Sequence, residues 1–393
     1  MRVLVDCTQI SKDKAGVGIY ALNLVKELVA MRTDLKLWLL VQDDDPDFFI
    51  TNASVQVLRV PARTFRRLPL RFLLEQIYIP WLAIRYRFDV VHSLHYAFPL
   101  LPMAAIKVVT VHDLTSFKLP DVHLPSKIRY FRFFLRASQR GADHVSFVSK
   151  STRDDYLAVF PRDIATCHVA TLGKSSEFHP NLDKARVDLV LQKYCLRKPF
   201  ILYIGTIEPR KNLTRLVEAF ATLALKYPTH ALVIAGKKGW MYNPIFDAVQ
   251  RLGVEGRVVF TGFVDEEEKP FLIRGAEIFV YPSLYEGFGI PVLEAMACGT
   301  PSITSNLSSM PEVAGDAALL VDPTCTDSLI AALGRLLAEP DLRRELSAKA
   351  VVQAERFTWK NTAEETYKIY RRAVARKQSQ PKQNASDLSS LNG

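Results

Sequence analysis

Short apolar runs alternate with amphipathic helical patterns along the whole chain. Runs rich in β-formers, separated by stretches with helical periodicity, predict parallel sheets covered by helices on both faces. A chain of 393 residues exceeds one ordinary hydrophobic core, so we expect two doubly wound, Rossmann-like α/β domains. The predicted strands are residues 3–5, 36–41, 55–60, 89–92, 108–112 and 144–148 in the first half, and 200–204, 231–235, 258–261, 277–281 and 302–304 in the second.

Clusters of Gly, Ser, Pro and Asn between Gly173 and Lys198 mark the boundary between the two halves. A helical pattern starts at Thr358, and the last residues have the Gln, Ser, Asn and Pro content of disordered chains. Ligands of doubly wound sheets bind beyond the carboxyl ends of the strands, so two facing sheets predict a site in a central cleft. The expected segments are a first domain (1–175), a linker (176–198), a second domain (199–357), a final helix (358–376) and a disordered tail (377–393).

Composition narrows the class of protein. About half of the residues are apolar and a quarter are charged, which excludes a disordered or fibrous chain. The five cysteines are scattered without any C-x-x-C spacing, so they indicate reduced thiols and neither a disulfide framework nor a zinc site. The first apolar run is too short for a secretory signal, and charges with Pro80 interrupt the run 68–84. We expect a cytoplasmic protein.

Two glutamates lie eight positions apart across a turn and a helix start. Glu286 follows the predicted strand, Gly287 and Gly289 allow a turn that a β-carbon would hinder, and Pro291 suits the first position of a helix. Glu294 then lies about one turn inside that helix. For two glutamates alone, a helix cap and a solvated helix residue would be the simpler interpretation. The strand, the glycines and the proline favour a ligand site.

The amides of Phe288, Gly289 and Ile290 form the N-terminal end of this predicted helix. Unpaired amides and the positive end of the helix dipole attract anions, phosphates above all. One carboxylate can therefore face a group on one side of a diphosphate, and the other can take hydroxyls on the far side.

Arg210 and Lys211 follow a strand and a turn at Gly205, and they precede an amphipathic helix that starts near Asn212. An arginine binds phosphate oxygens through two parallel hydrogen bonds, and a lysine adds a compact charge. A solvated pair would be the default interpretation, but cations at a helix N-terminus oppose its dipole. A departing nucleoside diphosphate accumulates negative charge that such cations would stabilise.

These blocks carry a family resemblance. The run 281–301 resembles the Glu-x7-Glu signature of retaining glycosyltransferases of family 4, which have the GT-B fold. Residues 299–305 and 311–315 are similar to the same family, and so is the block 203–213 with its strand, glycine turn and Arg-Lys pair. The resemblance covers nearly the whole chain. It implies two domains around a cleft and a last helix that crosses back onto the first domain, although Leu172 stands where the family commonly has asparagine before Gly173.

The resemblance also assigns roles. Arg210 and Lys211 would bind the donor diphosphate, Glu286 would lie by the donor sugar, and Glu294 would take the ribose hydroxyls. His112, at the end of a strand, would position or polarise the reacting sugar, although a lone histidine is usually structural. The expected catalytic residues are His112, Glu286, Arg210 and Lys211. The expected donor-binding residues are Gly16, Gly18, Gly205, Arg210, Lys211, Gly262, Phe263, Val264, Glu286, Phe288, Gly289, Ile290 and Glu294.

Two parts of this set rest on weaker patterns. The Gly16-Val-Gly18 loop, which the family places near the diphosphate and acceptor, could equally be an ordinary turn between a strand and a helix. The segment 262–264, matched to the part that approaches the base, could also be a simple turn. The acidic run 43–47 is interpreted as a solvated loop, and the resemblance implies neither a metal nor a cofactor.

The positive charge is concentrated in the first half. Between Arg59 and Arg140 there are 14 Lys or Arg against 4 Asp or Glu, a difference of +10 that equals the net charge of the whole chain. The segments 63–72 and 127–140 interleave cations with aromatic residues, a pattern that suits an anionic membrane surface or a nucleic acid. Because the family builds glycans on lipid diphosphates, we expect a peripheral contact with the inner face of the cell membrane and no nucleic acid.

The expected function is retaining transfer of a hexose to a lipid-linked or polysaccharide acceptor in O-antigen-like surface glycan synthesis. The form of 206–212 resembles branches of the family that use GDP-mannose, so mannose is the expected sugar. The alternatives are a sugar-nucleotide epimerase or hydrolase on the same frame, and a non-enzymatic protein that binds nucleotide sugars or nucleic acid. The pattern does not indicate an oligomeric state.

Overall fold

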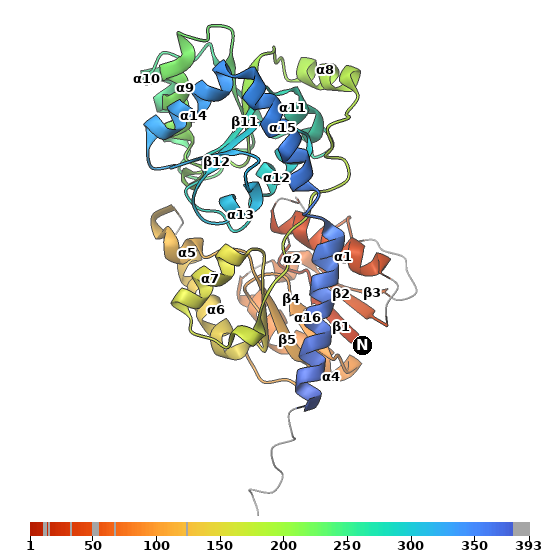
Figure 1. Ribbon diagram of the computed structural model, residues 1–393. Helices are drawn as coiled ribbons and strands as arrows, with labels where there is room; N and C mark the ends of the chain where they lie inside the picture. Colours follow the sequence, from red (N-terminus) through yellow and green to blue (C-terminus); the bar gives the residue numbers. More distant parts are fainter. Residues whose placement is uncertain are drawn as a thin grey trace, which may run out of the picture.

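The computed structural model shows two lobes stacked one above the other (Figure 1). It describes residues 1–379 except 11–13, 15, 32–33, 49–54, 67 and 123–124. The first lobe holds the N-terminal half of the chain and the second lobe the C-terminal half, and the last long helix lies along the first lobe.

The first lobe is built on a parallel sheet of seven strands in the order β3-β2-β1-β4-β5-β6-β7. Its central strands are buried, as expected for apolar runs covered on both faces. The strands are β1 (Arg2–Asp6), β2 (Lys36–Gln42), β3 (Val55–Val60), β4 (Val90–Ser93), β5 (Ile106–Val111), β6 (His144–Phe147) and β7 (Cys167–Val169). The helical segments are α1 (Val17–Ala30), α2 (Ala62–Phe65), α3 (Leu68–Leu73), the π-helix η1 (Leu74–Tyr78), α4 (Ile79–Tyr86), α5 (Thr115–Lys118), η2 (Pro120–Val122), α6 (Pro125–Gly141), α7 (Lys150–Val159) and η3 (Ile164–Thr166).

The second lobe repeats the plan with a parallel sheet of six strands in the order β10-β9-β8-β11-β12-β13. Its strands are β8 (Phe200–Ile204), β9 (Ala231–Ala235), β10 (Val258–Gly262), β11 (Ile278–Tyr281), β12 (Ser302–Ser305) and β13 (Leu319–Val321). Its helices are α8 (Lys184–Lys193), η4 (Pro209–Lys211), α9 (Leu213–Ala224), α10 (Asn243–Arg251), α11 (Lys269–Gly275), α12 (Ile290–Ala297), α13 (Met310–Ala314), α14 (Thr326–Ala338) and α15 (Pro340–Ala354), followed by the crossover helix α16 (Trp359–Ser379).

The predicted fold of two Rossmann-like domains is confirmed. The pattern missed β7 and β13, because each has only three residues at a sheet edge and too short a run to show a period. The prediction that 176–198 is only a linker was wrong. This segment contains α8, which buries Val187, Val190 and Leu191 and packs against α11 of the second lobe.

Helix α16 returns to the first lobe and packs against α1 (Figure 1). The Tyr370 hydroxyl lies 2.6 Å from His92 Nδ1 in the first lobe's core, and the Tyr367 hydroxyl donates to Asp34 at 2.6 Å. The helix continues to Ser379, so the expected start of a disordered tail at 377 was wrong. Residues 380–393 of that expected tail lie outside the described residues.

The lobes meet where the carboxyl ends of their strands face each other. The Tyr285 hydroxyl donates to Asp155 Oδ2 at 2.8 Å, and Thr152 Oγ1 donates to the Gly287 carbonyl at 3.0 Å. Glu312 of the second lobe accepts hydrogen bonds from the amides of Lys150 and Ser151 at the start of α7. An acidic side chain at a helix N-terminus satisfies free amides and complements the dipole, so this contact holds the two lobes in register.

Candidate active site

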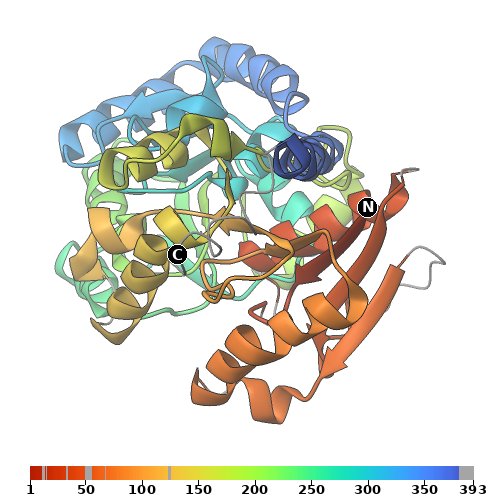
Figure 2. The same cartoon turned by 90° about the horizontal axis from the view of Figure 1, so that it is seen from below.

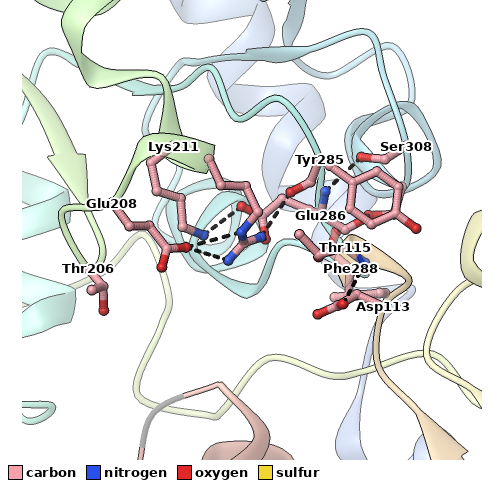
Figure 3. A network of polar contacts seen from close by, with 12 residues as sticks. Asp113, Thr115, Thr206, Glu208, Lys211, Tyr285, Glu286, Phe288 and Ser308 are labelled. Atoms are coloured by element: carbon pink, nitrogen blue, oxygen red, sulfur yellow. Dashed lines mark hydrogen bonds and ion pairs between the residues drawn. The ribbon is translucent and has the colours of Figure 1, made fainter. Parts of the chain in front are cut away.

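Arg210, Lys211 and Glu286 come together although 75 residues separate the lysine from the glutamate. Arg210 Nη1 lies 2.7 Å from Glu286 Oε2, and Lys211 Nζ lies 2.6 Å from Glu286 Oε1. Glu208 completes the group, because its Oε1 accepts from Arg210 Nε at 3.1 Å and from Nη2 at 2.7 Å. We call these four residues the Glu286 cluster (Figure 3).

Two loops at neighbouring strand ends position the Glu286 cluster. Arg210 and Lys211 lie in the short helix η4 after β8, and the glutamate lies after β11, which pairs with β8 in parallel. Asn212 adopts a left-handed conformation and joins the loops, since its side-chain amide donates to the carbonyls of Pro282 at 3.2 Å and Pro323 at 2.6 Å. The arrangement therefore follows from the order of the strands.

The charge balance of the Glu286 cluster is close to neutral, with two cations and two carboxylates. Burial alone would raise the pKa of Glu286, but Arg210 and Lys211 outweigh it and hold that pKa at about 2. The glutamate is therefore a permanent anion in the working pH range. After these hydrogen bonds and those to the Tyr285 carbonyl and the Tyr281 hydroxyl, Arg210 Nη2 and Lys211 Nζ each keep one N–H that has no acceptor among the described residues.

The N-terminal end of α12 lies beside the Glu286 cluster. Gly289 caps the helix with a φ of 103°, and a β-carbon there would lie 2.2 Å from the Met310 side chain. The amides of Phe288, Gly289 and Ile290 donate to no acceptor among the described residues. These are the unpaired donors that an anion at a helix N-terminus would use.

His112 reaches this loop from the first lobe. A β-carbon on Gly287 would lie only 1.7 Å from the His112 carbonyl oxygen, so glycine is required for this close approach. The ring Nε2 lies 2.8 Å from the carbonyl oxygen of Leu94, which can only accept, so Nε2 carries the proton. Burial lowers the pKa of His112, which keeps the ring neutral at pH 7 and leaves Nδ1 as an acceptor.

The Gly16-Val-Gly18 loop reaches the same region through the first turn of α1. Gly16 is the N-cap of α1, and its carbonyl accepts from the amide of Tyr20 at 3.1 Å. The Tyr20 ring contacts the His112 ring edge to face, with centroids 5.0 Å apart. Ala15, which precedes this loop, lies outside the described residues.

Glu294 occupies a separate position within α12. It is buried and faces Lys269, whose Nζ lies 3.2 Å from each carboxylate oxygen. Only Oε1 accepts a hydrogen bond, and Oε2 has no hydrogen-bond partner among the described residues. Lys269 also pairs with Glu266 at 2.9 Å. Burial raises the pKa of Glu294 to about 7, and the lysine opposes this shift only in part.

The remaining predicted donor residues line the carboxyl edge of the second sheet. The Gly205 amide donates to the Ala235 carbonyl at 2.9 Å, and the Gly262 carbonyl accepts from the amide of Gly236 at 2.7 Å. After Gly262, the Phe263 ring is exposed and Val264 is buried. The exposed ring offers an apolar face at the edge that follows β10.

Several residues that build this region were missed from the sequence. Glu208 lay inside the recognised block 203–213, but only the structure shows that it pairs with Arg210. Lys269 lay in a helix with no local signal, because its partner Glu294 is 25 residues away. Tyr285, which borders a pocket of about 300 Å³ between the lobes, was not among the expected residues. The pocket is lined by Lys118, Leu119, Ser151, Asp155, Leu284, Tyr285, Leu307 and Ser308.

The acidic run 43–47 pairs with basic side chains, and its Asp45 is buried, not solvated as expected. Lys14 Nζ lies 2.6 Å from Asp45 Oδ2, and Asp44 pairs with Arg66 at 2.7 Å. Across the described part of the chain, no three His, Cys, Asp or Glu side chains gather in a way that could hold a metal ion.

Comparison with known proteins decides the family. The profile described as glycosyl transferases group 1 matches residues 193–352, and that described as Glycosyltransferase Family 4 matches residues 15–171. O-antigen chain mannosyltransferase B of Escherichia coli is 33% identical over 385 residues, which span 94% of this chain and 100% of that protein. The chain belongs to the family 4 glycosyltransferases. Membership supports an enzyme that transfers hexoses over the epimerase, hydrolase and binding-protein alternatives.

Other relatives of this glycosyltransferase agree. O-antigen chain mannosyltransferase RfbU of Salmonella typhimurium is 28% identical over 347 residues, which span 86% of the chain and 92% of that protein. Sucrose-phosphate synthase from Thermosynechococcus elongatus superimposes with a TM-score of 0.75 at 22% identity, over 95% of this chain and 99% of that one. WaaG, a glycosyltransferase involved in lipopolysaccharide biosynthesis, gives 0.72 at 15% identity, over 94% and 99%. These structures confirm the GT-B fold.

Proposed function

We propose that this glycosyltransferase moves mannose from GDP-mannose, with retention of configuration, to a lipid-linked or polysaccharide acceptor in O-antigen-like surface glycan synthesis. Two relatives support the sugar and the pathway, since both are named O-antigen chain mannosyltransferases. We place the reaction in the cytoplasm at the inner face of the cell membrane.

The observation that carries the proposal is the meeting of two cations with the free end of α12. Arg210 and Lys211, which each keep a spare N–H group, both bind Glu286, and the open amides of Phe288, Gly289 and Ile290 begin two positions after that glutamate. A diphosphate carries several acceptor oxygens, and it would satisfy all of these donors at once. The two cations and the helix end supply the positive charge, so the proposal requires no metal.

Glu294, about one turn inside α12, supports a nucleoside. Its Oε2, which accepts no hydrogen bond among the described residues, can accept one from a ribose hydroxyl, and the ionised carboxylate can accept from both ribose hydroxyls. The exposed Phe263 ring at the same sheet edge offers a face for the base. Glu286 and Glu294 would then bracket the donor at its two ends.

His112 and Glu286 would act on the sugar. Neutral His112 presents Nδ1 as an acceptor for a sugar hydroxyl and so orients the ring. In the proposed step the bond from the anomeric carbon to the phosphate oxygen breaks, and a bond to the acceptor oxygen forms on the same face. The acceptor proton moves to the departing phosphate. Arg210 and Lys211 stabilise the charge that develops there, which lowers the barrier more than it tightens ground-state binding.

A thermal-shift panel tests the donor. GDP-mannose, GDP-glucose, UDP-glucose and ADP-glucose are each added to the protein, because a ligand at 100 times its Kd contributes about 2.7 kcal/mol to the folded state. We expect the largest rise in melting temperature with GDP-mannose and almost none in Arg210→Ala. A larger shift with a uridine or adenosine sugar would overturn the donor assignment. Rapid conversion of GDP-mannose without an acceptor would indicate a hydrolase or epimerase.

A further inference from the structure

The stretch α3–η1–α4 differs from an ordinary surface helix because it carries large apolar side chains on both of its faces. Leu74, Ile79 and Leu82 are buried together with Glu75 and Gln76, whereas other large apolar side chains point outward. Surface helices normally place their apolar stripe against the core and their polar face in water. A second apolar face that is exposed needs another reason.

The polar side chains are used inside the lobe. Glu75 is only 1% exposed, and its Oε1 accepts from Arg71 Nε at 3.1 Å and from Gln9 Nε2 at 3.1 Å. Gln76 is held by the loop after β4, donating to the Phe98 carbonyl at 3.1 Å and accepting from the Leu100 amide at 2.7 Å. These bonds fix the rotation of η1 and hold the apolar side chains outward.

The outer face consists of Phe72, Leu73, Ile77, Trp81 and Ile84. Ile77 is 62% exposed, Trp81 52% and Ile84 73%, and Trp81 stacks on Tyr78 with ring centroids 5.6 Å apart. Large exposed apolar side chains crowded into so short a segment mark an interaction site. Figure 2 shows this stretch, in orange, at the outer edge of the first lobe and away from the second lobe.

Arginines flank the outer face at both ends. Exposed Arg63 and Arg66 precede it, with Arg66 paired to Asp44, and exposed Arg85 and Arg87 follow it. Between 61 and 88 the sequence contains one acidic residue, the buried Glu75. An apolar stripe with an interfacial tryptophan and arginines at its ends has the chemistry of a segment that lies in the headgroup region of an anionic bilayer.

The same charges disfavour a second copy of the chain as the partner. A symmetric dimer through an antiparallel contact would place Arg63 and Arg66 of one copy against Arg85 and Arg87 of the other. Like charges at such close range are destabilising. A nucleic acid would match the arginines but would leave the apolar side chains without a partner.

We propose that the outer face of α3–η1–α4 docks this enzyme on an anionic phospholipid surface. The inference deepens the proposed function, because it names the surface that brings a lipid-linked acceptor to the first lobe. It also replaces the earlier segment 127–140 as the main contact. There Arg132 Nε donates to the Ser116 carbonyl at 2.8 Å, Arg136 lies over the Phe117 ring at 5.5 Å, and Lys127 lies over the Trp240 ring at 5.6 Å.

The docking segment is also connected to the reaction centre. Gln76 and Gln9 bind the carbonyls of Phe98 and Ala97, in the loop after β4. The same loop begins at Leu94, whose carbonyl orients the His112 ring. A lipid surface at the outer face would therefore lie one helix away from the groups that orient the sugar.

Vesicle flotation of the full chain tests the proposal. Wild type should float with vesicles of phosphatidylcholine mixed with phosphatidylglycerol, and much less with phosphatidylcholine alone. Ile84→Ser should weaken this binding by roughly tenfold, because it removes one large apolar side chain from the bilayer. Val352→Ser on α15, where the side chain is 72% exposed, is the matched control and should bind like wild type.

A second pair of variants tests whether the flanking arginines contribute to vesicle binding. Arg85→Gln should weaken binding to the anionic vesicles by about fivefold, since one basic residue near such a surface contributes about that factor. Arg344→Gln, an exposed arginine on α15, should change nothing. Retained melting temperatures would show that all four variants fold.

Three results would overturn the proposal. Equal vesicle binding by Ile84→Ser, Val352→Ser and wild type would show that the outer face does not bind the vesicles. A dimer in sedimentation that Ile84→Ser dissociates would show that the outer face binds a second copy. Unchanged vesicle binding by Arg85→Gln would show that the outer face does not recognise anionic lipid. Binding of GDP-mannose, measured in parallel, separates this failure from that of the proposed function, because no residue of the outer face contacts the Glu286 cluster.

Discussion

Glu286 and Glu294 are both buried carboxylates beside the same helix, yet their surroundings give them opposite electrostatic characters. Glu286 faces Arg210 and Lys211 at 2.7 and 2.6 Å, and its pKa is held at about 2. Glu294 shares Lys269 with Glu266, and burial raises its pKa to about 7. Burial penalises the charged form at both positions, so the number of cations devoted to each carboxylate decides the outcome.

The difference suits two separate tasks at the ends of one donor. A permanent anion among cations is rigid and fully hydrogen-bonded, which suits precise placement of the sugar and diphosphate. A carboxylate with one oxygen that accepts no hydrogen bond among the described residues keeps an acceptor for a hydroxyl, which suits recognition of a ribose. Removing partners from each carboxylate in turn is the direct way to break or sharpen this comparison.

The largest effect is expected when the Glu286 cluster loses its arginine. Arg210→Ala leaves Glu208 and Glu286 buried without a guanidinium, which should cost about 3–5 kcal/mol of unfolding free energy and at least about a hundredfold in transfer rate. Lys269→Ala is the matched change at the other end and should cost less, because Glu294 can take up a proton. Chemical denaturation measures both. Equal losses would end the distinction between the two carboxylates.

Glu286→Gln should have the second-largest effect. The amide keeps the size of the side chain but loses the charge between the two cations, so we expect about a hundredfold lower transfer rate with little change in the Kd of GDP. Steady-state kinetics and calorimetry with GDP separate these quantities. A tenfold or larger rise in the Kd of GDP with an unchanged rate would place Glu286 in nucleotide binding instead.

Glu294→Gln should lower the affinity for GDP-mannose. Replacing an oxygen acceptor by an amide donor weakens the contacts to a ribose by about tenfold in Kd and leaves the rate at saturation nearly unchanged. The 2′-deoxyribose analogue of GDP-mannose is the control. It should bind wild type and variant about equally, and a continued preference of wild type for it would show that Glu294 does not contact that hydroxyl.

The smallest effect concerns pH. A folded pKa of about 7 for Glu294 lies above its usual value of 4.5, so ionisation of this group destabilises the fold as pH rises through that window. The difference in stability between Glu294→Gln and wild type should therefore grow in favour of the variant from pH 5 to pH 8, by on the order of 1–3 kcal/mol. Thermal melts at the two pH values check this. A constant difference would mean that the carboxyl has no raised pKa.

The sequence predicted the fold well because its strands are buried runs with clear boundaries. The strands at 55–60, 200–204 and 231–235 lie where the pattern placed them, and the two motif blocks meet because β8 and β11 are neighbours. Pairings between distant residues were not predictable in the same way. Nothing in the chain near Lys269 points to Glu294. No local pattern shows that Ile77 in η1 and Trp81 in α4 point outward, since both would suit a buried helix.

The roles of the predicted site residues follow from the resemblance and stay predictions. Arg210, Lys211 and Glu286 form one cluster, and His112 approaches Gly287 across the lobes. Glu208 completes the charge balance of the cluster and was not among the expected residues.

The central claim is retaining mannosyl transfer that depends on the Glu286 cluster. Proton NMR of the product formed from GDP-mannose and octyl α-mannoside tests it most directly, with wild type compared with Glu286→Gln. We predict an α-linked mannoside from wild type and about a hundredfold slower formation of the same product by the variant. A β-linked product, or equal rates for the two proteins, would contradict the account.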